Sequence, residues 1–100
     1  MRRMKYIIID NGLEELPFIF SDLVNHNDME RALQRLVHGD TVSAGFVVIK
    51  HEEVGSHYME GDPTFETHFV CYGESISLDL KSRPEDSDVL NRVLGVTNQY

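Results

Sequence analysis

The fold is decided by two stretches of sequence, TVSAGFVVIK at residues 41–50 and THFVCYGESISLDLK at residues 67–81. Apolar residues load both faces of the first stretch, which is typical of a strand inside a sheet. In the second stretch, Ile76, Leu78 and Leu80 alternate with polar residues. This alternation predicts a strand with one buried and one solvated face. Gly73 interrupts the second stretch and indicates a bulge or bend. Together the two stretches predict a hairpin.

The connection between the two arms, residues 51–66, is long for a hairpin loop. It holds five acids and no Lys or Arg: Glu52, Glu53, Glu60, Asp62 and Glu66. Glycines and a proline break it, which favours turns. A loop of this length and charge is typical of a functional segment, a disordered one, or an addition to a shorter turn.

Two shorter strands are expected before the hairpin. Residues 5–10 are rich in β-branched side chains and end at Asn11-Gly12, a strong turn signal. Three consecutive isoleucines in this segment predict a strand that is covered on both faces. Residues 17–20 form the second strand, and the proline at its start favours a strand opening or an edge.

Two helices are expected from capping boxes followed by apolar stripes. The first box is Asn27 with Glu30, and its stripe is Met29, Ala32, Leu33, Leu36 and Val37. The second box is Ser82 with Glu85, and its stripe is Val89, Leu90, Val93 and Leu94. Gly39 and Gly95 end the two helices. Residues 96–100 are predicted to be a frayed tail.

The order of elements is therefore ββαββα in a single domain of residues 1–100. It predicts an α+β fold, with a mostly antiparallel sheet of about four strands and two helices on one face. Two helices cover one face only, so apolar residues are left on the other. We expect Val47, Ile49 and Phe69 to form an exposed interaction surface there. A symmetric homodimer would bury it.

The charge of the chain limits its partners. The 17 acidic and 9 basic residues give a net charge of −8, which argues against direct binding to nucleic acid or to an anionic membrane. It favours a basic protein as partner. No apolar run approaches the roughly 18 residues needed to cross a bilayer. A single cysteine excludes an internal disulfide, and we expect a cytoplasmic location.

Few residues are candidates for metal binding, catalysis or cofactor binding. His51, His57 and His68 are candidate metal ligands because imidazole binds zinc-like ions, but their spacing matches no metal motif. Cys71 and His68 are three residues apart on a predicted strand, so they would face opposite sides. No glycine-rich phosphate loop is present. The sequence thus predicts no catalytic residue and no cofactor.

Part of the sequence resembles a family of small bacterial proteins. The segments are VSAGFV at residues 42–47, CYGESISL at residues 71–78 and KSRPED at residues 81–86. They are similar to uncharacterised proteins found in phages and prophages. The resemblance implies no activity, but it implies a cytoplasmic accessory protein that acts on a host or phage macromolecule. It also implies that residues 51–66 are an insertion specific to this chain.

Two functional hypotheses follow. The first is a non-enzymatic protein-interaction or regulatory module that associates through an exposed sheet face. The alternative is a protein that binds a metal or a small ligand, or an enzyme, through the histidines and acids of residues 51–71.

Overall fold

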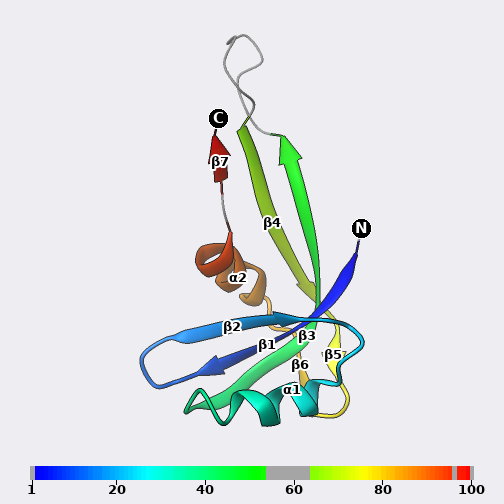
Figure 1. The fold of residues 1–100 in the computed structure, drawn as a ribbon, viewed down its shortest axis with the longest axis vertical. Coiled ribbons are helices and arrows are strands. Elements are labelled where there is room, and N and C mark those ends of the chain that lie inside the picture. Colours follow the sequence, from blue (N-terminus) through cyan, green and yellow to red (C-terminus); the bar gives the residue numbers. More distant parts are fainter. Residues whose placement is uncertain (1, 54–63, 96, 100) are drawn as a thin grey trace.

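Five antiparallel strands form the main sheet, in the order β2-β1-β3-β4-β7. The computed structural model describes residues 2–53, 64–95 and 97–99. Its elements are β1 (Arg3–Asp10), β2 (Glu15–Phe20), α1 (His26–Leu33), β3 (Asp40–Glu53), β4 (Thr64–Tyr72), β5 (Glu74–Ser75), β6 (Leu80–Lys81), α2 (Asp86–Leu94) and β7 (Thr97–Gln99). The predicted α+β class and the order ββαββα are confirmed, with β5, β6 and β7 as additions (Figure 1).

β1 lies in the middle of the fold. It pairs with β2 along one edge and with β3 along the other, so its backbone groups are satisfied on both sides. Tyr6, Ile7, Ile8 and Ile9 are all fully buried. The prediction that both faces of this strand are covered is confirmed.

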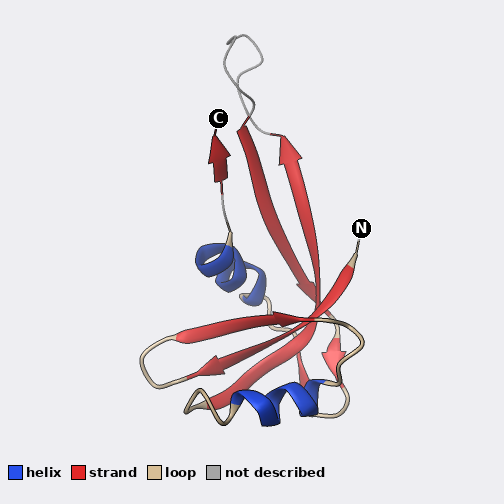
Figure 2. Ribbon diagram, in the orientation of Figure 1, coloured by secondary structure: helices blue, strands red, loops and turns tan. Residues whose placement is uncertain are grey.

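The two helices cover opposite faces of the sheet, not one face as the sequence suggested. Ile7 and Ile9 pack in one cluster with Leu33 of α1. Tyr6 and Ile8 pack in another cluster with α2, through its residues Val89 and Leu90. Neighbouring residues of a strand point to opposite faces, so the two clusters lie on either side of β1. Figure 2 shows α2 beside the β4 end of the sheet and α1 against the other end.

The hairpin of β3 and β4 is longer than predicted, because residues 51–53 and 64–66 are strand and not loop. The rest of the predicted loop, residues 54–63, lies outside the described residues. The two strands project from the rest of the sheet (Figure 1), and we call this projection the arm. At the other end of the chain, residues 97–99 pair with β4 where a frayed tail was expected.

The second strand of the predicted hairpin, residues 67–81, ends earlier than expected. β4 stops at Tyr72 because Gly73 has φ of +79°, a conformation that suits glycine and turns the chain away from the sheet. β5 and β6 then form a separate two-stranded sheet, and the Ser82 N–H donates a hydrogen bond to the Gly73 carbonyl at 2.9 Å. Ile76, predicted to be buried on a strand, is 90% exposed in the turn of this small hairpin.

Both helices begin away from the predicted caps. Asn25, and not Asn27, precedes α1, and Leu36 is exposed beyond the end of the helix. α2 begins at Asp86, whose carboxylate accepts a hydrogen bond from the Arg83 backbone N–H at 3.0 Å. Among the described residues, no helix has the length and apolar character that a membrane span requires.

Candidate functional site

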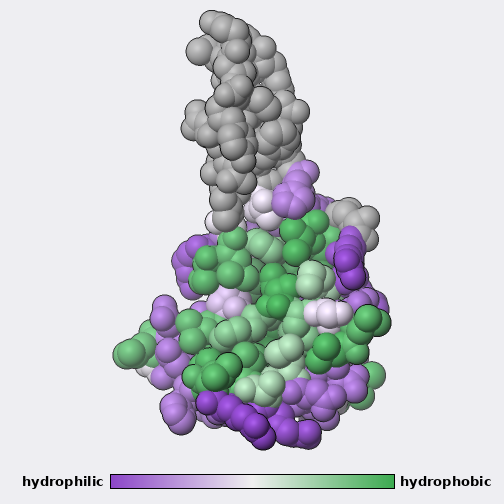
Figure 3. Space-filling view, in the orientation of Figure 1, coloured by the Kyte–Doolittle hydropathy of each residue, from purple (hydrophilic) through white to green (hydrophobic). Residues whose placement is uncertain are grey.

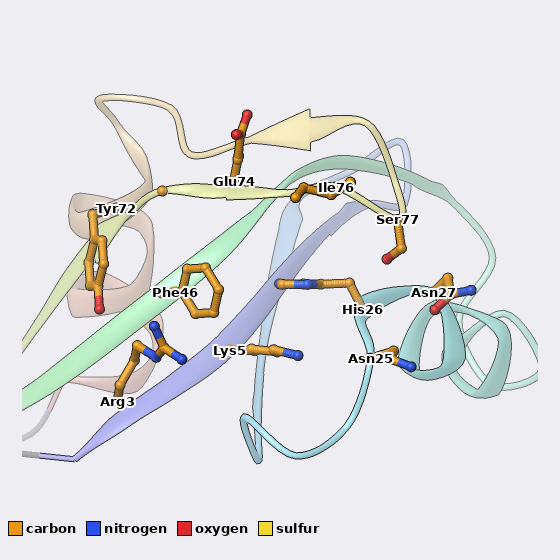
Figure 4. A pocket seen from close by; sticks show the side chains of 11 residues that line it. Arg3, Lys5, Asn25, His26, Asn27, Phe46, Tyr72, Glu74, Ile76 and Ser77 are labelled. Atoms are coloured by element: carbon orange, nitrogen blue, oxygen red, sulfur yellow. The ribbon is translucent and has the colours of Figure 1, made fainter.

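A concavity lies on the α1 side of the sheet, where β3 leaves the body of the protein to form the arm. Its volume is about 710 Å³, and we call it the hollow. It is lined by Arg3 and Lys5 of β1, Asn25, His26 and Asn27 at the start of α1, Phe46 of β3, Tyr72 of β4, and Gly73, Glu74, Ile76 and Ser77 after it. Figure 4 shows Arg3, Phe46 and Tyr72 at one end of the hollow and His26, Asn27 and Ser77 at the other.

Two cations come from β1. Arg3 and Lys5 are two residues apart on a strand and therefore share a face. The Arg3 guanidinium carbon lies 4.4 Å from the centre of the Phe46 ring, a cation–π contact. Lys5 Nζ donates a hydrogen bond to the Val24 carbonyl at 2.9 Å. Neither cation forms an ion pair with a carboxylate in the described part of the chain, so most of their donors are available to a ligand.

An aromatic pair stands beside these cations. Phe46 and Tyr72 are direct partners in the register of β3 and β4, and their ring centres lie 5.9 Å apart. Tyr72 remains 41% exposed, and Val70 on the next rung of that face is also exposed. Exposed apolar groups beside unpaired cations are suited to a ligand that carries both an apolar and an anionic part.

His26 forms the inner wall of the hollow. It is 4% exposed, and its Nε2 donates a hydrogen bond to the Gly45 carbonyl at 2.8 Å. Its ring meets Phe20 and Phe46 edge to face. Burial lowers the pKa of His26, the bond to Gly45 raises it, and Lys5 lowers it further. The ring therefore holds the start of α1 against β3 in its neutral form.

The small β5–β6 hairpin supplies the opposite wall. Its turn places Ile76 and Ser77 at the rim, and Glu74 is the single carboxylate among the described lining residues. The lining therefore has a basic balance in a chain whose net charge is −8. In the view of Figure 3, apolar surface crosses the middle of the molecule over the sheet, and hydrophilic side chains lie along the lower edge near α1.

The residues predicted to form an open apolar face lie in the core. Val47 is 0% and Phe69 is 7% exposed, and the half-buried Ile49 packs against the same cluster beneath α2. Because α2 covers this side of the sheet, the predicted surface is not open in the folded chain. The opposite face is covered by α1 only in part, and Val70 and Tyr72 remain exposed on it beside the hollow.

The predicted metal ligands do not converge where the structure describes them. His51 Nδ1 is hydrogen-bonded to Thr67 Oγ1 at 3.0 Å, whereas His68 pairs with Lys50 on the adjacent rung, so the two imidazoles point to opposite faces. His57 lies outside the described residues. No group of three or more His, Cys, Asp or Glu side chains in the described ranges is placed to hold a metal ion.

Cys71 does not have the environment of a nucleophile. Burial, and then the nearby Asp86 carboxylate, raise the pKa of its thiol to about 12. The thiol is therefore protonated at neutral pH, and a protonated thiol is a poor nucleophile. Its backbone N–H donates a hydrogen bond to Ser87 Oγ at 2.9 Å, which ties β4 to α2.

The hollow is not predicted by the sequence pattern. The spacing of two residues between Arg3 and Lys5 on a strand is a signal in the sequence that they share a face. The contribution of Asn25 and His26 had no comparable signal, because it depends on where α1 is placed.

Comparison of this chain with protein-family models, with curated proteins and with solved structures finds no match.

Proposed function

We propose that the protein is a non-enzymatic interaction module that binds an acidic segment of a partner protein in the hollow. The observation that carries the proposal is the combination of Arg3 and Lys5, which have no carboxylate partner among the described residues, with the exposed ring of Tyr72. Carboxylates of a partner would pair with the cations, and an apolar side chain of the partner would cover the ring.

The charge expected of the partner segment follows from the local charge of the hollow and not from the net charge of the chain. The value of −8 favours basic partners at long range, but salt screens such fields beyond about 10 Å. Within the hollow, the two cations Arg3 and Lys5 outnumber the one carboxylate of the described lining, Glu74. An acidic segment is therefore the better fit at contact distance.

The polar groups of the hollow support binding better than catalysis. The Nε2 atom of His26 is engaged by a backbone carbonyl, and its ring is enclosed by two phenylalanines. A general base needs a nitrogen that can reach a substrate proton. His26 instead maintains the shape of the wall.

The proposal is tested by titrating the ¹⁵N-labelled protein with synthetic peptides of acidic, neutral and basic sequence, each containing one aromatic residue. We expect the acidic peptides to shift the amide signals of residues 3–5, 25–27 and 72–77. The variant Arg3→Glu/Lys5→Glu should lose the effect. Arg35→Glu/Arg92→Glu changes net charge equally and should keep it. Shifts caused equally by all peptides, or absent with every peptide, would refute the proposal.

A second candidate is a small anionic ligand, because the volume of about 710 Å³ is that of a small-molecule pocket. The same titration with inorganic phosphate and with adenosine monophosphate tests it. Saturable shifts at Arg3, Lys5 and Tyr72 with either probe, and none with the acidic peptides, would favour this candidate.

A further inference from the structure

The two faces of the sheet are covered unequally where the arm begins. On one side, Val47 and Ile49 of β3 and Phe69 of β4 pack beneath α2. The residues between them along the strands, Val48 and Val70, point to the opposite side. The cluster beneath α1 contains neither of these valines, and Val70 is 40% exposed. In the described part of the chain, these rungs therefore have a helix on one side only.

The surface without a helix continues the hollow along the arm. Its residues, which we call the arm face, are Val48, Lys50, His68 and Val70. Arg3 of the hollow is the register partner of Val48, so a cation borders the valines on the β1 side. Lys50 is half-buried on the next rung, and it forms no ion pair in the described part of the chain. The rung after it pairs Glu52 with Glu66, so the cationic surface ends at Lys50.

We propose that the partner segment is an acidic amphipathic helix, which packs on the arm face and reaches into the hollow. The inference rests on the proposed function, and it names the form of the segment. The apolar stripe of the helix covers Val48, Val70 and the ring of Tyr72. Its carboxylates pair with Arg3 and Lys50 at the border of that stripe. The helix is thus the counterpart of α2 on the opposite side of the same rungs.

The size and the backbone chemistry of this surface favour a helix. The four-residue step from Phe46 to Lys50 along β3 covers about 13 Å, at about 3.3 Å per residue. A helix rises about 1.5 Å per residue, so about nine residues span this distance. α2, which covers the matching rungs on the other side, has nine residues. An extended segment laid on a sheet face would bury backbone N–H and C=O groups without partners, whereas a helix satisfies them internally.

Three synthetic peptides test the inference, by fluorescence anisotropy and by titration of the ¹⁵N-labelled protein. The first is a lactam-bridged helix of about 14 residues, with leucines along one stripe and glutamates elsewhere. The second has the same composition in scrambled order, and the third is unbridged with a central proline that breaks the helix. We expect the first to bind about tenfold more tightly than the others. It should shift the amide signals of residues 48–50 and 68–70 together with those of the hollow.

Two variants on the arm face, outside the lining of the hollow, separate this inference from the proposed function. Val70→Ser should weaken binding of the bridged peptide on the order of fivefold, because it removes an apolar contact. Lys50→Glu should weaken it on the order of tenfold, because it sets a like charge against the glutamates. The matched controls Val93→Ser and Arg92→Glu change exposed residues of α2 and should leave binding unchanged. Circular dichroism should confirm that every variant is folded.

Two results would overturn the inference and leave the proposed function standing. One is equal binding of the bridged peptide and the proline peptide. The other is unchanged binding in both arm-face variants while Arg3→Glu/Lys5→Glu abolishes it. If no acidic peptide binds the natural chain, both proposals fall.

Discussion

The Tyr6 hydroxyl donates a hydrogen bond of 2.5 Å to Asp86, and this bond joins residues 80 positions apart in the chain. Both residues are fully buried. Asp86 also accepts a bond from Arg83 Nε at 2.8 Å, and the Arg83 guanidinium reaches Glu15 with bonds of 2.7 and 3.1 Å. These hydrogen bonds, to Glu15 foremost, raise the pKa of Arg83. The network connects β1, β2 and the start of α2. It gives hydrogen-bond and charge partners to the buried Asp86 carboxylate, which would destabilise the fold if it were unpaired.

Removing the Tyr6 hydroxyl should destabilise the protein. In Tyr6→Phe, Asp86 Oδ2 keeps only the Arg83 backbone N–H as a partner. We expect the free energy of unfolding to fall by about 1–3 kcal/mol, the usual cost of an incompletely satisfied buried polar group. Urea unfolding measures it. Tyr72→Phe removes a hydroxyl from a partly exposed ring and should change stability by about 0.5 kcal/mol or less. Equal effects of the two changes would contradict the role given to the buried bond.

The stability of the fold should depend on the protonation of His26. Because burial lowers its pKa in the folded chain, the unfolded chain, with a pKa of 6.5, takes up the proton first as the pH falls. The contribution of neutral, buried His26 to the free energy of unfolding is therefore complete above pH 6.5. It is lost as the pH drops below that value toward the lowered pKa of the folded state. Urea unfolding over this range should show a steeper loss for the natural chain than for His26→Gln.

The matched control for this pH dependence is His38→Gln, because His38 is exposed. It should keep the pH dependence of the natural chain. If His38→Gln and His26→Gln reduce the pH dependence of the free energy of unfolding equally, burial of His26 is not the cause of that dependence.

Cys71 should react slowly with thiol reagents while the protein is folded. Its pKa of about 12 leaves little thiolate at neutral pH. We expect alkylation by iodoacetamide to be much faster in denaturant, where the thiol returns to its ordinary pKa. In the folded chain, the rate of alkylation should rise with pH for as long as the protein stays folded. Mass spectrometry of the alkylated fraction measures both rates. Equal rates in the folded and denatured chain would contradict this environment.

Gly39 should not tolerate a side chain. A Cβ atom at this position would lie 2.3 Å from the Asp10 carbonyl oxygen, and backbone must move to relieve that contact. We expect Gly39→Ala to cost about 1–3 kcal/mol, as overpacking does. At Gly12 no atom lies within 4 Å of such a Cβ, although φ is +93°. Gly12→Asn should therefore cost less, about 1 kcal/mol, because asparagine tolerates positive φ. Thermal unfolding compares the two variants.

Much of the fold follows from local pattern. The run of isoleucines in β1, the turn at Asn11-Gly12 and the bend at Gly73 each specify their structure through side-chain shape or backbone freedom. The placement of the helices does not follow, because an apolar stripe identifies the buried side of a helix but not the face of the sheet that it covers. The alternation at Ile76, Leu78 and Leu80 was misleading for a related reason: a short hairpin with a positive φ at Asp79 produces the same period.

The candidate site was the harder part. A pattern in one strand shows that Arg3 and Lys5 share a face, but their proximity to Tyr72 is set by pairing across β1, β3 and β4. The predicted surface at Val47 and Phe69 depended on the assumption that one face of the sheet stays bare. α2 covers those residues, and the exposed apolar groups Val70 and Tyr72 lie instead on the part of the opposite face that α1 does not cover.

The central position of β1 has a consequence for the synthesis of the protein. Tyr6 and Ile8 leave the ribosome long before Val89 and Leu90, the α2 residues that cover them. Contacts of such long sequence separation form late and slowly. A nascent chain that lacks α2 would present an apolar strand surface to other chains, so we expect ribosome-bound intermediates of this protein to recruit chaperones until α2 emerges.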